Sequence, residues 1–305
     1  MTPDRRPNPV ASIRQRLLNI ATERREDFQF VLVRYAVERL LYRLSKSPHA
    51  DRFVLKGAML LNIWSDTPHR PTRDVDFLGY GEPTVPDLVE TFRQLCDIAV
   101  EDDGVVFQPD SVKGRVIREE AEYGGVQITM IASLGNARIP VRIDIGFGDV
   151  VTPSPQLEVL PSILGLPSPS IRAYNRETFI AEKLQAMVFL GMANSRMKDF
   201  CDIAAIARHF AFKGELLSEA IRRTFARRQT PIPQEPPMAF TAAFAEAPDK
   251  QTLWKVFAER YPNELQDLPL ADVVAQIRRF LQPPLDSLKA GRLFDSYWPP
   301  NGPWQ

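Results

Sequence analysis

Two aspartates separated by one residue stand at the start of an apolar segment, and this segment constrains the fold more than any other. Asp74 and Asp76 lead into Phe77 and Leu78. In a β-strand the side chains alternate between two faces, so both aspartates point to one face while Val75 and Phe77 point into a core. Two carboxylates on one half-buried face repel each other and are costly to desolvate unless a cation lies between them. The pattern predicts a strand that carries a cation site.

A hard divalent cation suits these carboxylates. Mg²⁺ prefers oxygen ligands and is commonly held by one or two carboxylates together with substrate phosphates. A third aspartate, Asp144, interrupts the apolar alternation of a later strand-like segment, 139–147, where an unpaired charge is costly. If the two strands are neighbours, we expect Asp74, Asp76 and Asp144 to form one Mg²⁺ site. The alternative is a strand edge or turn that happens to carry acids.

The residues before the paired aspartates suggest a phosphate-binding turn. Lys56 and Gly57 follow an apolar run, and glycine lets the backbone turn tightly or approach a ligand closely. A helix that starts just after this glycine offers free N–H groups to a phosphate. Thr72 precedes Asp74 by two residues, where its hydroxyl either caps a turn or donates to a phosphate. Lys56 is either a surface residue or a phosphate ligand.

Composition is typical of a soluble globular protein. Of the 305 residues, 44% are hydrophobic and 25% are charged, and 38 Lys and Arg balance 38 Asp and Glu. A nucleic-acid partner would therefore need a local basic patch. No apolar run reaches the roughly 18–20 residues of a membrane span. Cys96 and Cys201 lack metal-ligand spacing and are expected to be buried and reduced, which favours a cytoplasmic protein without a membrane partner.

Hydrophobic periodicity predicts helices first and then strands in the first half of the chain. Helical spacing starts at Val10 and continues over 27–45, where Asp27 is a suitable N-cap. Another helix is expected to start near Thr84. The region 104–147 is rich in Val and Ile and predicts four strands, with a hairpin turn at Gly135-Asn136.

The second half is predicted to be helical, and prolines divide it. Prolines cluster in 152–169, 230–237 and 282–284, which indicates linkers or loop breaks. The helix expected to end near Arg227 carries four arginines in or just after its last turn. Cations are favoured there by the helix dipole, so these residues are a capping feature first and an RNA-facing patch second. The arginines are Arg222, Arg223, Arg227 and Arg228.

Four blocks occur in order along the chain: FVLKGAMLL, RPTRDVDFLG, VRIDIGFGD and EKLQAMVFLGMANSRMKDFCDI. Taken together they resemble the AbiEii/AbiGii toxin family, which is similar to the DNA polymerase β nucleotidyltransferase superfamily. The resemblance implies an α+β fold, in which a small mixed β-sheet core is flanked by helices and a large helical C-terminal lobe follows. We expect N-terminal helices over 1–50, the core sheet over 51–170, and a helical lobe over 171–305 that completes the active site.

The resemblance also implies roles for individual residues. Asp74 and Asp76 match the paired metal-binding acids, and Asp144 matches the third acid. Lys183 matches a helix lysine that would hold the nucleotide phosphates, and Asp199 matches the first acid of a KDxxD block. These five are the expected catalytic residues. The expected nucleotide-binding residues are Lys56, Gly57, Thr72, Lys183, Arg196 and Asp202.

In function, the resemblance implies a toxin of a bacterial toxin–antitoxin or abortive-infection system. Such an enzyme would use two Mg²⁺ ions to transfer a nucleoside monophosphate from an NTP to an RNA acceptor, with the 3′ end of tRNA favoured, and a cognate antitoxin would restrain it. Transfer to a small molecule or a protein side chain is the alternative among enzymes. A catalytically idle module that binds nucleotide or RNA is the alternative outside them.

Overall fold

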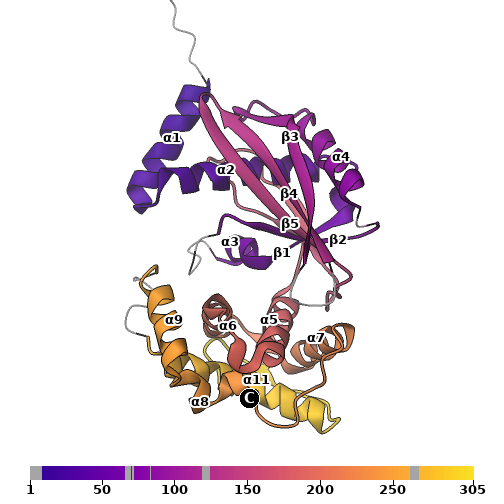
Figure 1. Cartoon of the computed structure of the whole chain (residues 1–305), viewed down its shortest axis with the longest axis vertical. Coiled ribbons are helices and arrows are strands. Elements are labelled where there is room, and N and C mark those ends of the chain that lie inside the picture. The colour runs from indigo at the N-terminus through magenta and orange to yellow at the C-terminus, as the bar shows by residue number, and fades with distance from the viewer. Residues whose placement is uncertain (1–8, 66–69, 71, 83, 119–123, 262–267) are drawn as a thin grey trace, which may run out of the picture. The chain divides into compact units, whose positions relative to one another are not determined.

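A computed structural model of the chain describes residues 9–65, 70, 72–82, 84–118, 124–261 and 268–305. The chain divides into two compact units (Figure 1). The first unit consists of Met1–Gly148 and Gln156–Ala173, and the second consists of Asp149–Pro155 and Tyr174–Gln305. The first contains a mixed sheet with helices, and the second is mostly helical, so the expected α+β class is confirmed.

A mixed sheet, seven-stranded in the described part of the chain, forms the centre of the first unit. Its strand order is β3-β4-β5-β2-β1-β7-β6. β2 runs parallel to β5 and β1 runs parallel to β7, while the other neighbours are antiparallel. The strands are β1 (Phe53–Lys56), β2 (Val75–Gly79), β3 (Val105–Arg118), β4 (Gly124–Leu134), β5 (Ala137–Phe147), β6 (Gln156–Val159) and β7 (Ser170–Ala173).

Two strand predictions need correction. The first two of the four strands expected over 104–147 are one strand, β3, with an irregularity between Gln108 and Lys113. Bulges leave residues unpaired without ending the strand, which explains the apparent break. The proline-rich segment 152–169 is more than a linker, because it contains β6, which pairs with β7 at the sheet edge. The hairpin turn at Gly135 is confirmed, and its φ of 58° suits glycine.

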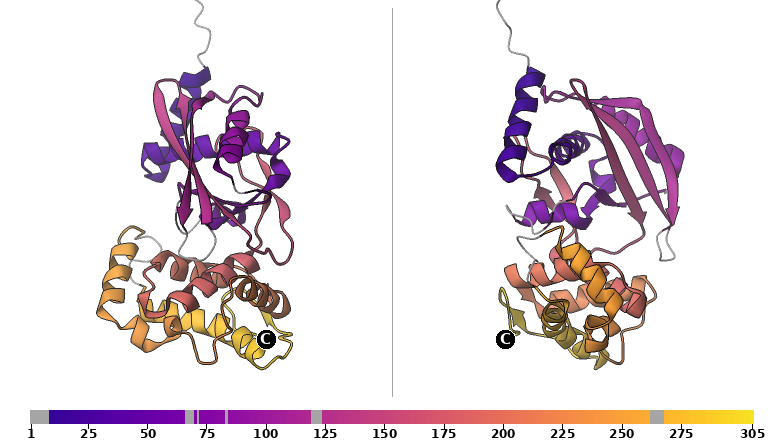
Figure 2. Two further views of the ribbon diagram at one scale, coloured as in Figure 1. Left: turned by 45° about the vertical axis from the view of Figure 1, so that its right-hand side comes forward. Right: turned by 60° about the vertical axis from the view of Figure 1, so that its left-hand side comes forward.

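Helices cover one face of this sheet. α1 (Pro9–Arg24) packs on α2 (Phe28–Ser45), and α2 contacts both β5 and α4 (Val85–Cys96). Figure 1 shows α2 running behind the long strands, and Figure 2 shows it end-on between α1 and those strands. The ring of Phe92 in α4 lies 5.7 Å from that of Phe53 in β1. Phe53, Phe77 and Ile145 share this covered face, so Asp76 and Asp144 point to the other face.

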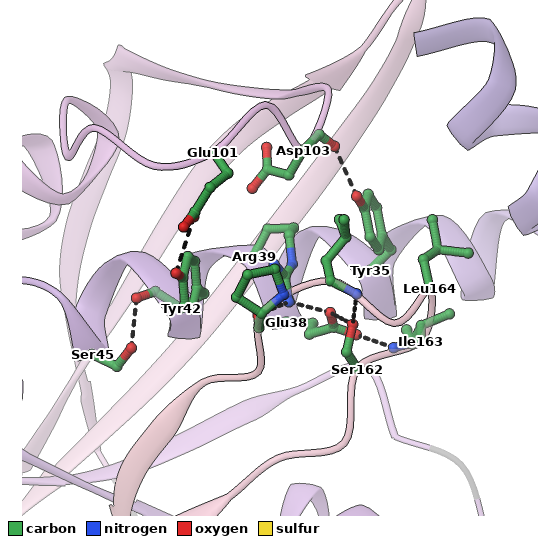
Figure 3. Close-up of polar contacts among 12 residues, drawn as sticks. Tyr35, Glu38, Arg39, Tyr42, Ser45, Glu101, Asp103, Ser162, Ile163 and Leu164 are labelled. Carbon is green, nitrogen blue, oxygen red and sulfur yellow. Dashed lines mark hydrogen bonds and ion pairs between the residues drawn. The ribbon is translucent and has the colours of Figure 1, made fainter. Parts of the chain in front are cut away.

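Helix α2 is buried nearly all round, which its apolar stripe alone does not predict. Its N-cap is confirmed, since the Asp27 carboxylate accepts a hydrogen bond from Phe30 N at 2.9 Å. Glu38 and Arg39, both almost fully buried, pair with each other. Glu38 also accepts hydrogen bonds from Ser162 Oγ and Ile163 N, at 2.9 and 2.7 Å (Figure 3). Buried charges need such partners, and here they attach the loop before β7 to α2.

The second unit is built from helices, with one short strand pair, β8 (Phe212–Lys213) and β9 (Tyr297–Trp298). Trp298 is buried and its Nε1 donates to Ala207 O at 2.7 Å, so the C-terminal segment packs back on the helices. The helices of this unit are α5 (Arg176–Leu190), α6 (Met197–His209), α7 (Gly214–Arg227), α8 (Ala242–Ala245), α9 (Pro248–Ala258) and α11 (Leu270–Lys289).

The loop break expected at 282–284 is wrong, because α11 continues through Pro283 and Pro284. A proline inside a helix removes the hydrogen bond to the carbonyl four residues earlier. For Pro284 that carbonyl belongs to Phe280, and the Trp304 Nε1 donates to it at 2.8 Å. The C-terminal tryptophan therefore satisfies the group that the proline leaves unpaired.

Two further expectations concern the cysteines and the membrane. Both cysteines are free; Cys201 is buried as expected, whereas Cys96 is only half-buried. Desolvation raises the pKa of the Cys96 thiol to about 12, so it is protonated at neutral pH. Among the described residues, no helix combines the length and the apolar character needed to cross a membrane.

Candidate active site

Two acids from distant parts of the chain are neighbours on the open face of the first unit's sheet, and a third acid lies two residues before one of them. Asp76 lies in β2 and Asp144 in β5, and the two residues are direct partners in the parallel ladder. Asp74 immediately precedes β2. The strands that carry the acids are therefore neighbours, as the sequence analysis required for a shared site.

An arginine neutralises part of this acid cluster. The Arg142 guanidinium lies 2.6 Å from Asp74 Oδ1 and 4.0 Å from Asp144 Oδ2. Arg142 and Asp144 are two residues apart in β5, so they share a face. The side chains of Arg142 and Asp74 are about half exposed, at 49% and 50%. Among the residues described, no group of three His, Cys, Asp or Glu side chains is close enough to hold a metal ion as it stands.

Gly57 lies directly against the acid cluster. It adopts a φ of 68°, and a Cβ added to it would lie 2.0 Å from Asp76 Oδ2. Glycine is therefore required both by the backbone conformation and by the Asp76 carboxylate. The preceding residue, Lys56, is the ladder partner of Asp76 in β1. Gly57 opens η2 (Gly57–Leu60), a 3₁₀ turn that continues into α3 (Leu61–Trp64).

Thr72 lies in the segment that leads to β2. Its hydroxyl donates to the Asp74 carbonyl at 3.4 Å, a long hydrogen bond. Of the two roles considered, this contact matches the turn-forming one, in which a threonine hydroxyl bonds to nearby backbone.

A second polar cluster lies in the second unit, where α5 meets α6. Lys183 Nζ lies 2.6 Å from Asp199 Oδ1 and 2.9 Å from Asp202 Oδ2. Both aspartates are fully buried, and the lysine is 12% exposed. Arg196 Nε lies 2.8 Å from the other Asp199 oxygen. The four residues carry two positive and two negative charges, so the cluster balances internally, as buried charges require.

The four arginines at the end of α7 differ in their surroundings. Arg228 is largely buried and forms two hydrogen bonds of 3.0 Å to Asp149, and it also lies 3.2 Å from Glu182. Arg222 and Arg223 are exposed and pair with Glu219. These hydrogen bonds, with Arg222 first, lower the pKa of Glu219 to about 2. Arg228 therefore has a role inside the unit, whereas Arg222 and Arg223 face solvent.

Comparison with protein families assigns the chain to a family. Residues 39–285 match the family described as nucleotidyl transferase AbiEii toxin, type IV TA system. This chain belongs to the AbiEii family. It is accordingly a nucleotidyltransferase of the toxin–antitoxin type. No curated protein matches the chain.

Two solved structures from Helicobacter pylori are similar to this AbiEii-family chain. The crystal structure of JHP933 has a TM-score of 0.50 and 15% sequence identity, and the match covers 87% of this chain and 98% of that chain. The crystal structure of a "putative nucleotidyltransferase" has a TM-score of 0.48 and 13% identity, covering 87% of this chain and 99% of that chain. At this identity the likeness to JHP933 concerns the fold alone.

Sequence reasoning missed three polar residues around the AbiEii-family acids. They are Arg142, Gln127 in β4, whose Nε2 donates to Asp144 Oδ1 at 2.7 Å, and Arg115 in β3, which contacts Gln127. A signal was present, since Gln127 interrupts an apolar strand just as Asp144 does. Arg142 shares a face with Asp144 by strand alternation.

Proposed function

We propose that this chain is a Mg²⁺-dependent toxin that transfers a nucleoside monophosphate from an NTP to an RNA acceptor, the 3′ end of tRNA, and thereby blocks translation. The observation that carries the proposal is the direct register of Asp76 with Asp144 on neighbouring parallel strands, with Asp74 beside them. Carboxylates on directly paired residues repel each other unless a cation lies between them. Their arrangement is therefore suited to metal-dependent chemistry.

The donor set fits Mg²⁺. Asp74, Asp76 and Asp144 offer hard oxygen ligands, and Asp74 is half exposed. An exposed ion pair such as Arg142–Asp74 contributes only about 0.2–1 kcal/mol, so a divalent ion can displace the arginine at little cost. When bound, two Mg²⁺ ions would stabilise the attacking and leaving oxygens of an in-line displacement at the α-phosphate.

Residues of the chain would then carry out the steps of nucleotidyl transfer. The acceptor hydroxyl oxygen forms a bond to the α-phosphorus, the bond to the β-phosphate breaks, and pyrophosphate leaves. Asp144 accepts the proton of the attacking hydroxyl. Arg142, once released from Asp74, offers its guanidinium to an NTP phosphate, and Gly57 allows close backbone approach.

Residues of the second unit would bind the triphosphate. Lys183 neutralises charge that develops as pyrophosphate leaves, and Asp199 and Asp202 hold the lysine in place. Arg196, which is 44% exposed, is the group of this cluster most accessible to a nucleotide.

Transfer of label to RNA tests the proposal. Purified protein is incubated with each α-³²P-labelled NTP, Mg²⁺ and total tRNA, beside an Asp74→Ala variant. We expect label in the tRNA band with the wild-type protein and none with the variant. Label in low-mass or protein fractions would move the acceptor to a small molecule or a protein. Tight NTP binding without any Mg²⁺-dependent product would favour an idle binding module.

The exposed arginines of α7 are expected to contribute to RNA binding. The variant Arg222→Gln/Arg223→Gln should weaken tRNA binding and flatten its salt dependence, because each lost phosphate contact lowers the slope of log K against log salt by about 0.7–0.9. Arg228 stays unchanged because it pairs internally. The matched control is Arg278→Gln/Arg279→Gln, an adjacent exposed pair in α11. Equal slopes for both double variants would remove the α7 arginines from the RNA surface.

A further inference from the structure

A row of polar side chains crosses the open face of the sheet and ends at Asp144. Arg115 in β3 is the ladder partner of Gln127 in β4, and Gln127 is the ladder partner of Asp144 in β5. Direct partners in neighbouring strands point to the same face. The row therefore continues the line that Asp144 and Asp76 form in β5 and β2, outward to the edge strand β3.

Two hydrogen bonds connect this row in one direction. The Arg115 Nε donates to Gln127 Oε1 at 2.9 Å, and the Gln127 Nε2 donates to Asp144 Oδ1 at 2.7 Å. Arginine can only donate and an ionised carboxylate can only accept. The amide of Gln127 consequently has one compatible orientation, because the reverse would set its NH₂ against the guanidinium and its oxygen against the carboxylate.

The burial of Gln127 makes this orientation costly to lose. The residue is only 6% exposed, and its neighbours in β4 include the buried residues Val126 and Ile128. A buried amide that loses one hydrogen-bond partner is left with a desolvated polar group that water cannot satisfy, which destabilises that arrangement. Gln127 is therefore held firmly, and it holds Asp144 Oδ1 in turn. The second oxygen, Oδ2, is the one that faces Arg142, at 4.0 Å.

We propose that Gln127 is a positioning residue for Asp144, and that Arg115 acts through Gln127. The hydrogen bond from Gln127 occupies Oδ1 and leaves Oδ2 on the side of Arg142, so that Asp144 offers one preset oxygen to a cation. The inference deepens the proposed function and rests on it, since it assumes that Asp144 belongs to the metal site. Residues that orient a metal ligand typically change metal affinity 10–100-fold when mutated.

Mn²⁺ binding, followed by electron paramagnetic resonance of the free ion, tests the inference without relying on catalysis. We expect Gln127→Met to weaken Mn²⁺ binding about 10–100-fold, because methionine keeps the length of the side chain but donates nothing to Asp144. Arg115→Met should weaken binding by a smaller factor and should have no further effect in the Gln127→Met background, because its action passes through Gln127. Arg138→Met, which removes an exposed charge from the same strand as Asp144, should leave binding unchanged.

The outcomes separate this inference from the proposed function. Wild-type Mn²⁺ affinity in a folded Gln127→Met protein, or additive effects in the double variant, would overturn the positioning role and leave the metal site intact. If Gln127→Met fails to fold, Arg115→Met decides alone, since Arg115 is exposed, and unchanged affinity in that variant overturns the inference. A wild-type protein that binds no Mn²⁺ and labels no acceptor would refute the proposed function itself, and the inference with it.

Discussion

Replacing Asp76 with asparagine is expected to reduce nucleotidyl transfer by about three orders of magnitude, while the protein stays folded. Metal ions contribute several kcal/mol to such transition states, and each ~1.4 kcal/mol is a factor of ten in rate. Asparagine keeps the shape of aspartate and so preserves the ladder with Lys56 and Asp144. Removing one of two neighbouring like charges also relieves repulsion, so the loss of transfer should not come from a loss of the fold.

Single-turnover transfer and thermal unfolding measure the two halves of this prediction for Asp76→Asn. The matched control is Asp110→Asn, since Asp110 is an exposed aspartate of the same sheet, in β3. This control should transfer at the wild-type rate. Near-normal transfer by Asp76→Asn would remove Asp76 from the reaction. A marked loss of stability would instead indicate that its carboxylate supports the fold.

The core of the acid site could be predicted from sequence because strand alternation is a local rule. The alternation of Asp74, Val75 and Asp76 implied one polar and one buried face, and a charge inside an apolar strand marked Asp144. No local rule determines that these two strands lie side by side. That arrangement depends on a parallel β2–β5 pairing across more than sixty intervening residues, so it could be stated only as a condition.

Other features were missed because their cause lies in tertiary contacts. Pro283 and Pro284 indicate a break by every local rule, yet α11 continues, and a tryptophan distant in sequence satisfies the freed Phe280 carbonyl. β6 has only four residues, three of them exposed. Leu157 and Val159 alternate with polar residues, but a run this short between prolines indicates a loop. Gln127 could have been found by the reasoning that found Asp144, because both are polar residues in an apolar strand. Its role could not be predicted, because that role depends on the side chains of its ladder partners.

Replacing Lys183 with methionine is expected to lower the free energy of unfolding by about 3–5 kcal/mol, the usual cost of breaking a buried ion pair. The variant leaves Asp199 and Asp202 fully buried without the ammonium that now lies 2.6 and 2.9 Å from them. The Arg196 side chain lies beside Asp199, so it remains as a counter-charge for that carboxylate. Denaturant unfolding measures the loss. At a temperature where the variant is still folded, transfer should fall about 10²–10³-fold if Lys183 also stabilises the leaving pyrophosphate.

A triple variant separates the structural role of Lys183 from the catalytic one. In Lys183→Met/Asp199→Asn/Asp202→Asn the two buried charges are gone, and Arg196 remains partly solvated, so stability should recover most of the loss, as neutral replacements of buried ion clusters often do. A triple variant no more stable than Lys183→Met would disprove the unpaired-charge explanation. Full transfer by the folded single variant would instead assign Lys183 to the fold alone, because a lysine that binds the triphosphate cannot be removed without slowing the departure of pyrophosphate.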